Sequence, residues 1–129
     1  MEPIELSKLE VARRQLEAAI NLYFADGDEV SIHTLAAASY NVIHDIVEKK
    51  KLGPMIVKDL VVKSSKPEMR TLLRQALNEA ENFFKHADRD PEAILKFFPI
   101  QTEYLIFDAE TRYQILTSTL PDVFLVFRG

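Results

Sequence analysis

The residues best suited to chemistry lie where a predicted helix ends, between Asn82 and Pro91. His86 is the candidate general base there, because an imidazole exchanges a proton near neutral pH. Asn82 lies four residues before His86, so both side chains sit on one helical face, one turn apart, and can act on the same neighbour. Lys85 and the acidic residues that follow add charge but match no motif that dictates a reaction. We therefore treat Asn82 and His86 as candidate catalytic residues without assigning a reaction.

Three charged residues lie within apolar helical patterns, where a buried charge needs a partner. Asp108 and Arg112 are one turn apart in the most apolar helix, and each can neutralise the other. Arg13 falls in the core-facing arc of the first helix, where Glu17 can neutralise it or its head can extend to water. A sharper hypothesis is that the five candidate residues meet in one partly buried polar pocket: Arg13, Asn82, His86, Asp108 and Arg112.

The three histidines raise the question of a metal ion, since imidazole is a common ligand of transition metals. His33 and His44 are eleven residues apart, roughly 16 Å along a helix, so they cannot bind one ion together. The Glu-x-x-His pair of di-iron bundles does not occur. His44 with Glu48, or His86 with a carboxylate from another helix, could still form a site. We predict no metal ion and no cofactor.

Composition excludes several other classes of function. The chain has no cysteine, which rules out thiol nucleophiles and thiolate ligands. Its three glycines form neither a phosphate-binding loop nor the Gly-x-Ser-x-Gly turn of serine hydrolases. The 16 basic residues are outnumbered by 20 acidic ones, and this net charge of -4 argues against a nucleic acid or an anionic membrane as partner. Without a targeting segment or an apolar run of membrane-spanning length, we expect a cytoplasmic protein.

Helical periodicity dominates the sequence, so we predict an all-α fold. Start signals support the helices: Ser7 with Glu10 fits a capping box, and Ser31 is the predicted cap of the second helix. No repeat or linker divides the chain. Residues 1–129 should therefore form a single compact helical bundle of four to five main helices with short connecting helices. The predicted helices are 8–24, 31–49, a short one over 55–63, 65–87, a short one over 90–99, and 102–118.

Three apolar surfaces in this bundle need cover. The first helix carries a second apolar stripe, which another part of the chain or a second subunit must bury. The last helix is apolar on nearly every side and should be deeply buried. Residues 123–127 are all apolar and have high β-propensity, so we expect the segment 121–129 to dock on the bundle or on a partner subunit. We therefore expect a homodimer, with a different protein partner as the alternative.

A long helix that carries Asn-x-x-Lys-His, here Asn82, Lys85 and His86, resembles the HEPN group of small helical domains from bacterial toxin–antitoxin and defence systems. The resemblance covers the helices from Ser31 to Ala87. Ribonucleases of this group carry an arginine, four to six residues and then a histidine, and no histidine of this chain follows an arginine at that distance. This departure argues against RNA cleavage. The chain is also similar to uncharacterised bacterial all-helical proteins, which implies no activity.

Three functions are compatible with these features. Our prediction is a non-enzymatic helical bundle that binds a partner or a small ligand, as a homodimer, through the polar edge around His86. The first alternative is a divergent HEPN-type nuclease or toxin–antitoxin component, with His86 as base and Arg13 or Arg112 stabilising an anion. The second alternative is a metal-binding helical protein.

Overall fold

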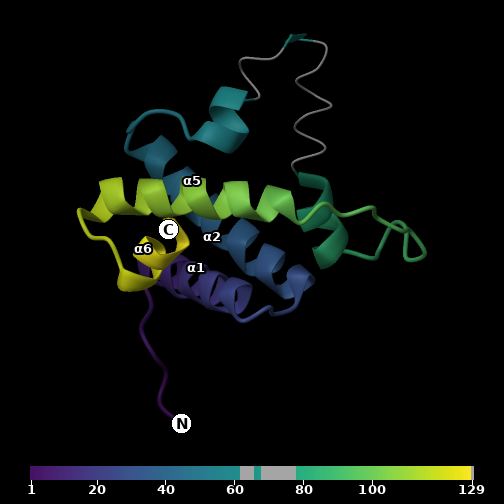
Figure 1. Cartoon of the computed structure of the whole chain (residues 1–129), viewed down its shortest axis with the longest axis horizontal. Helices are drawn as coiled ribbons and strands as arrows, with labels where there is room; N and C mark the ends of the chain where they lie inside the picture. Colours follow the sequence, from purple (N-terminus) through teal and green to yellow (C-terminus); the bar gives the residue numbers. More distant parts are fainter. Residues whose placement is uncertain (62–65, 68–77, 129) are drawn as a thin grey trace.

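The chain folds into a helical bundle whose core is built by three long helices, as the computed structural model in Figure 1 shows. The structure describes residues 1–61, 66–67 and 78–128. Every regular element among them is helical, so the predicted all-α bundle is confirmed. None of the described helices combines the length and the apolar character needed to cross a membrane. The elements are α1 (Lys8–Phe24), α2 (Glu29–Lys49), the π-helix η1 (Ile56–Val61), a helix over residues 78–85, α5 (Ile100–Thr117) and α6 (Asp122–Arg128).

The first two helices form a pair joined by a short turn, and each has a side-chain cap. Ser7 caps α1 by accepting the backbone amide of Glu10 at 3.1 Å, as predicted. The cap of α2 is Asp28 rather than the predicted Ser31, since Asp28 Oδ2 accepts both the amide and the hydroxyl of Ser31 at 2.9 Å. A carboxylate is a stronger acceptor than a hydroxyl and suits the positive end of the helix dipole. The helix therefore starts before the predicted position.

The core lies between α1, α2 and α5, and α2 packs against both of the others. Small residues on α1 and α2, such as Ala12, Ala19 and Ala36, let the helices approach closely. Each large apolar side chain that the core buries contributes about 1.5–3 kcal/mol to the free energy of unfolding. The largest fully buried apolar side chains come from α1, α2, α5 and α6, together with the residue before η1: Leu16, Ile20, Tyr40, Ile43, Met55, Ile106 and Phe124.

The C-terminal segment docks on the bundle as the short helix α6, although its composition favours a strand. Phe124 is fully buried and meets Tyr113 edge to face, with ring centroids 5.6 Å apart. Phe127, one turn on, packs against Tyr23 and Phe24 of α1. A helix brings both phenylalanines to one face, so tertiary burial overrides the β-propensity.

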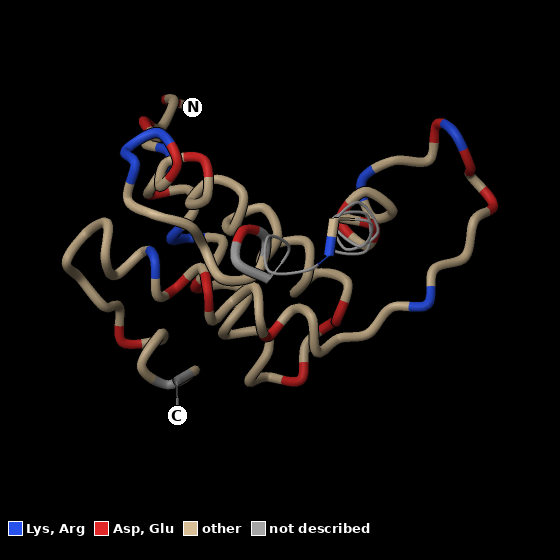
Figure 2. The backbone as a smooth tube through the Cα atoms, turned by 90° about the horizontal axis from the view of Figure 1, so that it is seen from above, with Lys and Arg blue, Asp and Glu red and all other residues tan. Residues whose placement is uncertain are grey.

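One predicted helix in the second half of the chain does not form. Residues 86–98 form turns and irregular chain in place of a short helix over 90–99, and Figure 2 shows them looping away from the bundle. Ile94 is 93% exposed, so a helix there would bury too little apolar surface to offset the entropy lost on ordering. The preceding helix ends at Lys85, before the predicted Ala87, and the predicted helical stretch over 68–77 lies outside the described residues.

The last long helix, α5, is buried on one face only, whereas the sequence predicts burial on nearly every side. Its inner face packs against α1 and α2 through Leu105, Ile106, Ala109 and Tyr113. The side of α5 that points away from this inner face carries the large exposed side chains of the helix. We call this opposite side the outer face of α5. It presents four large exposed side chains, Ile100, Tyr104, Phe107 and Ile115.

Candidate functional site

The five residues that the sequence singles out are spread over three parts of the fold: α1, the end of helix 78–85, and α5. Arg13 is bonded at 3.1 Å to Glu17 of its own helix, as predicted. Asn82 and His86 are exposed at the end of helix 78–85, where the His86 amide donates to the Asn82 carbonyl at 3.1 Å. The His86 ring makes no hydrogen bond or ion pair within the described part of the chain. These placements give no support to a common buried pocket.

Asp108 is the best-connected of the five candidates. It comes from the inner side of α5, is 1% exposed, and accepts the hydroxyl of Tyr40 at 2.9 Å. Its carboxylate also accepts the backbone amides of Ile56 and Val57 at 3.1 and 2.9 Å. The first amides of a helix have no partner within that helix. Asp108 therefore caps η1 from another element, and its buried charge is satisfied by three donors.

Arg112 acts on the same connection as Asp108. Its guanidinium donates to the carbonyl of Pro54, two residues before η1. The ion pair predicted between Asp108 and Arg112 does not form, because each side chain bonds to the chain that leads into η1 instead. The two residues do work together, but as structural anchors.

A second carboxylate extends this network to the surface. Asp59 of η1 accepts the Met55 amide with Oδ2 at 2.8 Å, and its Oδ1 lies 2.9 Å from Nε2 of His44. The His44 ring is stacked on Tyr40, with centroids 6.1 Å apart and planes 18° apart. His44 and Asp59 line a cleft of about 580 Å³ together with Glu48 at the end of α2 and Lys51 just after it. Sequence reasoning identified His44 but not Asp59.

The two other histidines lie in contrasting surroundings. His33 is fully buried, with Nδ1 at 2.8 Å from the hydroxyl of Thr102. The rings of Phe84 and Phe97 cover it, with centroids 5.7 and 5.0 Å away. This histidine joins helix 78–85 and the loop after it to α2. A histidine–hydroxyl pair can activate a nucleophile, but this one is sealed from any substrate.

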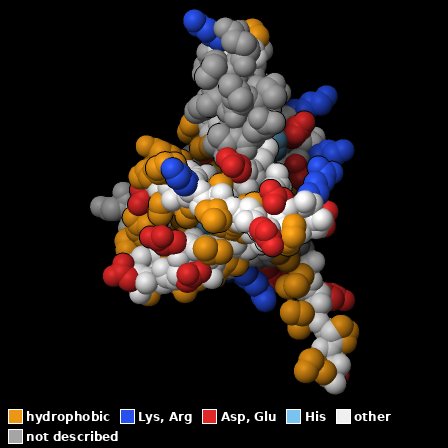
Figure 3. Space-filling view, turned by 90° about the vertical axis from the view of Figure 1, so that its right-hand side faces the viewer, with side chains coloured by type: hydrophobic (Ala, Val, Ile, Leu, Met, Phe, Trp, Pro, Cys, Tyr) orange, Lys and Arg blue, Asp and Glu red, His pale blue; other side chains and the backbone are white. Residues whose placement is uncertain are grey.

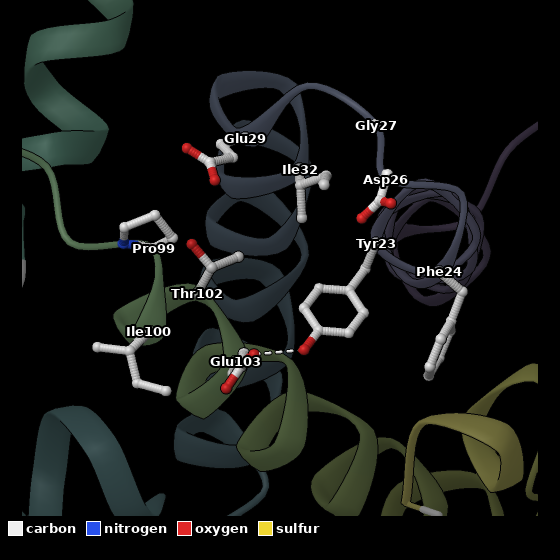
Figure 4. Close-up of a pocket in the computed structure, with 10 residues that line it drawn as sticks. All are labelled: Tyr23, Phe24, Asp26, Gly27, Glu29, Ile32, Pro99, Ile100, Thr102 and Glu103. Atoms are coloured by element: carbon white, nitrogen blue, oxygen red, sulfur yellow. Dashed lines mark hydrogen bonds between the residues drawn. The ribbon is translucent and has the colours of Figure 1, made fainter.

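A larger cleft of about 700 Å³ lies where the α1–α2 turn meets the start of α5 (Figure 4). Three of its lining residues are acidic, namely Asp26, Glu29 and Glu103, and none is lysine or arginine. Figure 4 shows these side chains arriving from three parts of the chain, with Ile32 directed into the space between them. Such a lining favours a cationic group over an anionic one. Glu103 is far from Asp26 and Glu29 in sequence, and for this reason no local motif predicts the cleft.

One hydrogen bond crosses the floor of this cleft. The Tyr23 hydroxyl of α1 donates to Oε1 of Glu103 on α5 (Figure 4). This hydrogen bond, partial burial and the negative charge of Glu103 raise the pKa of Tyr23 above its ordinary value of 10.0. A tyrosine with a raised pKa stays protonated at neutral pH and serves here as a donor that links two helices.

No group of described residues combines a nucleophile, a base and a stabilising cation in an open cleft, the arrangement that acyl or phosphoryl transfer requires. Comparisons with protein-family models, with curated proteins and with solved structures found no match to this chain. The resemblance to the HEPN group therefore stays a prediction.

Proposed function

We propose that this protein is a non-enzymatic, cytoplasmic interaction protein that forms a homodimer through the outer face of α5. The observation that carries the proposal is the exposure of that face. Its four large side chains, in chain order, are 53, 62, 47 and 53% exposed. Their spacing of four, three and eight residues places them in one stripe along the helix. A continuous group of large apolar side chains in water marks a surface that another molecule covers.

The apolar surface extends beyond α5. Phe98, just before the helix, is 67% exposed and adds a further aromatic ring next to Ile100. The stripe from Ile100 to Ile115 spans fifteen residues, about 22 Å of helix. Figure 3, which faces the end of the molecule where α5 begins, shows apolar side chains interrupting the charged surface on this side. A stable interface needs roughly 800 Å² from each partner, and a stripe of this length with its margins is of that order.

The order of residues in the stripe favours a second copy of this chain as the partner. In an antiparallel pair of α5 helices, Ile100 of one copy lies opposite Ile115 of the other. Tyr104 then lies opposite Thr111, and Phe107 meets its own counterpart near the two-fold axis. A stripe that matches its own reverse in this way is self-complementary, which a two-fold interface requires.

The charges at the margins of the stripe agree with such a pairing. Glu103 lies on one margin, where Gln114 and Glu110 of the other copy are nearest in the antiparallel arrangement; Glu110 is fully buried, so no exposed carboxylate opposes Glu103. On the other margin Asp108 is buried and Arg112 is bonded to Pro54 of its own chain. Like charges therefore do not face each other across the interface.

The nuclease alternative gains nothing from the geometry. His86 stands exposed, and the two arginines proposed as anion stabilisers are bonded to Glu17 and Pro54 within their own surroundings. A base, an anion-stabilising group and a binding cleft must converge for cleavage of a phosphodiester.

Sedimentation analysis across a range of protein concentrations tests the proposal. We expect the unchanged protein to be a dimer and Phe107→Glu to be a monomer, because two carboxylates would then meet near the two-fold axis. Phe107 is half exposed, so the helical circular dichroism signal of this variant should be unchanged. Ile94→Glu is the matched control, since it makes the same kind of change at an exposed position away from α5, and it should remain a dimer. A monomeric unchanged protein, or a dimeric Phe107→Glu, overturns the proposal.

A further inference from the structure

His44 stands out because three carboxylates surround one imidazole ring. Asp45 and Glu48 come from α2 itself, with carboxylate oxygens 3.8 and 3.9 Å from Nδ1 of His44. Asp59 approaches the other ring nitrogen, Nε2, from η1 at 2.9 Å. Three potential ligand atoms, one each from His44, Asp45 and Glu48, lie within 4.8 Å of one another.

The His44 ring is held so that Nδ1 faces the two carboxylates of α2. Asp59 fixes Nε2, and it is itself fixed because its second oxygen accepts the Met55 amide. A carboxylate oxygen accepts a hydrogen bond, so Nε2 carries the proton and the lone pair of a neutral ring lies on Nδ1. Tyr40 stacks on the face of the ring and restricts its rotation. A histidine that donates one N–H to a carboxylate and presents its other nitrogen is the usual arrangement of a metal ligand.

We propose that Nδ1 of His44 and the carboxylates of Asp45 and Glu48 bind a divalent transition-metal ion of the Zn²⁺ type. Asp59 is the positioning residue that orients His44 without touching the metal. One imidazole and two carboxylates suit Zn²⁺ or Co²⁺, and three protein ligands leave a coordination position for water.

The geometry allows the ligands to close around such an ion. Tetrahedral Zn²⁺ sites have ligand atoms about 3.4 Å apart, given bonds of about 2.0–2.2 Å. The side chains of Asp45 and Glu48 are 81% and 76% exposed, so they are free to move the remaining distance. His44, at 22%, is the preformed part of the site. Lys51 lines the same cleft.

A metal ion would also remove an electrostatic cost. Without a cation, the lone pair of a neutral His44 faces two negative groups, and a third lies on the other side of the ring. This metal site is independent of the homodimer proposed above, because it uses no residue of the outer face.

Titration of the full chain, carrying no histidine tag, with Co²⁺ and Zn²⁺ tests the proposal. Ligand-field absorption of Co²⁺ reports coordination directly, and calorimetry with Zn²⁺ gives stoichiometry. We expect one ion per chain, with binding lost in His44→Ala and strongly weakened in Glu48→Gln. His86→Ala is the matched control, since it removes a histidine that does not line this cleft, and it should bind as the unchanged protein does. Glu48→Gln alters an exposed side chain, so it decides the question even if His44→Ala does not fold.

Asp59→Asn separates a positioning role from a structural one. Loss of an outer carboxylate typically weakens metal binding about 10- to 100-fold, so we expect a shift of that size with an unchanged Co²⁺ spectrum. If Asp59 only stabilises the fold, the folded variant will bind Co²⁺ as tightly as the unchanged protein, and the positioning role is wrong. The metal site as a whole is overturned if the unchanged protein does not bind either ion, or if His44→Ala or Glu48→Gln binds as tightly as the unchanged protein.

Discussion

The connection that leads into η1 and the connection over residues 86–98 are held in opposite ways. In the first, side chains bond to the backbone: Asp108 of α5 accepts two amides, Arg112 of α5 donates to a carbonyl, and Asp59 of η1 itself accepts a third amide. In the second, the backbone hydrogen bonds are local, such as Ala93 to Asp90 at 3.2 Å. One connection becomes a π-helix packed on α5, and the other loops away from the bundle (Figure 2).

The comparison shows that a charged side chain buried in a core helix can hold a neighbouring connection in place by hydrogen bonds to its backbone. Burying Asp108 costs free energy, and three donors offset that cost. In return, Asp108 accepts the backbone amides of Ile56 and Val57, which need a hydrogen-bond partner in a buried backbone. These polar anchors act alongside the fully buried side chain of Met55, and together they hold the connection into η1 against the bundle.

Removing Asp108 should produce the largest change in this comparison. Asp108→Ala leaves two buried amides and the Tyr40 hydroxyl without their acceptor, so we expect the free energy of unfolding to fall by about 3–5 kcal/mol. Chemical denaturation measures this loss, and amide exchange should show that the protection of Ile56 and Val57 disappears.

Graded variants keep this test informative if Asp108→Ala does not fold. Tyr40→Phe removes one of the three donors and should cost about 1–2 kcal/mol. Asp108→Asn retains an acceptor oxygen, so its loss in free energy of unfolding should lie between those of Asp108→Ala and Tyr40→Phe. A loss in Asp108→Ala no larger than that in Tyr40→Phe would show that the cap on η1 contributes little.

Much of the fold could be predicted from sequence because its signals are local. Helix α1 begins at a capping serine as predicted, and the basic end of α2 suits its C-terminus. Asp108 attracts notice for the same reason, as a charge inside an apolar pattern. Its partners could not be predicted, since Tyr40 and Ile56 are 68 and 52 residues away in the chain.

The outer face of α5 and the site at His44 illustrate what a sequence leaves undecided. Periodicity shows that α5 is apolar on several sides but not which side the neighbouring helices will cover. His44 and Glu48 are one turn apart and could be paired from sequence, whereas Asp59 joins them only because Asp108 and Arg112 hold η1 against α5.

The loop over residues 86–98 offers a matched pair of variants. Phe97 is half buried against His33 and Phe84, so Phe97→Ala should lower the free energy of unfolding by about 1–2 kcal/mol, less than a fully buried phenylalanine would. Ile94→Ala, in the exposed part of the same loop, should change it by less than about 0.5 kcal/mol. Urea denaturation resolves the two values. Equal effects would mean that the loop is attached along its whole length rather than through one ring.

The α1–α2 turn lies between these two connections in how it is held, because a single exposed carboxylate caps the helix that follows it. We expect its variants to change the stability of the protein least. The Ser31 amide and hydroxyl, which bond to Asp28, hold the pKa of this carboxyl below its ordinary value of 3.8. The cap therefore stabilises the folded chain fully above pH 3.8, and this contribution is lost as the pH falls through the lower pKa of the folded state. Asp28→Asn keeps a capping acceptor that does not titrate. The difference in urea midpoint between the unchanged protein and Asp28→Asn should thus be constant from neutral pH down to about pH 4. Below that pH, the unchanged protein should lose stability relative to Asp28→Asn. Urea titrations can be carried down to pH 2.5. If the difference between the two midpoints is still unchanged there, the charge of Asp28 does not stabilise α2.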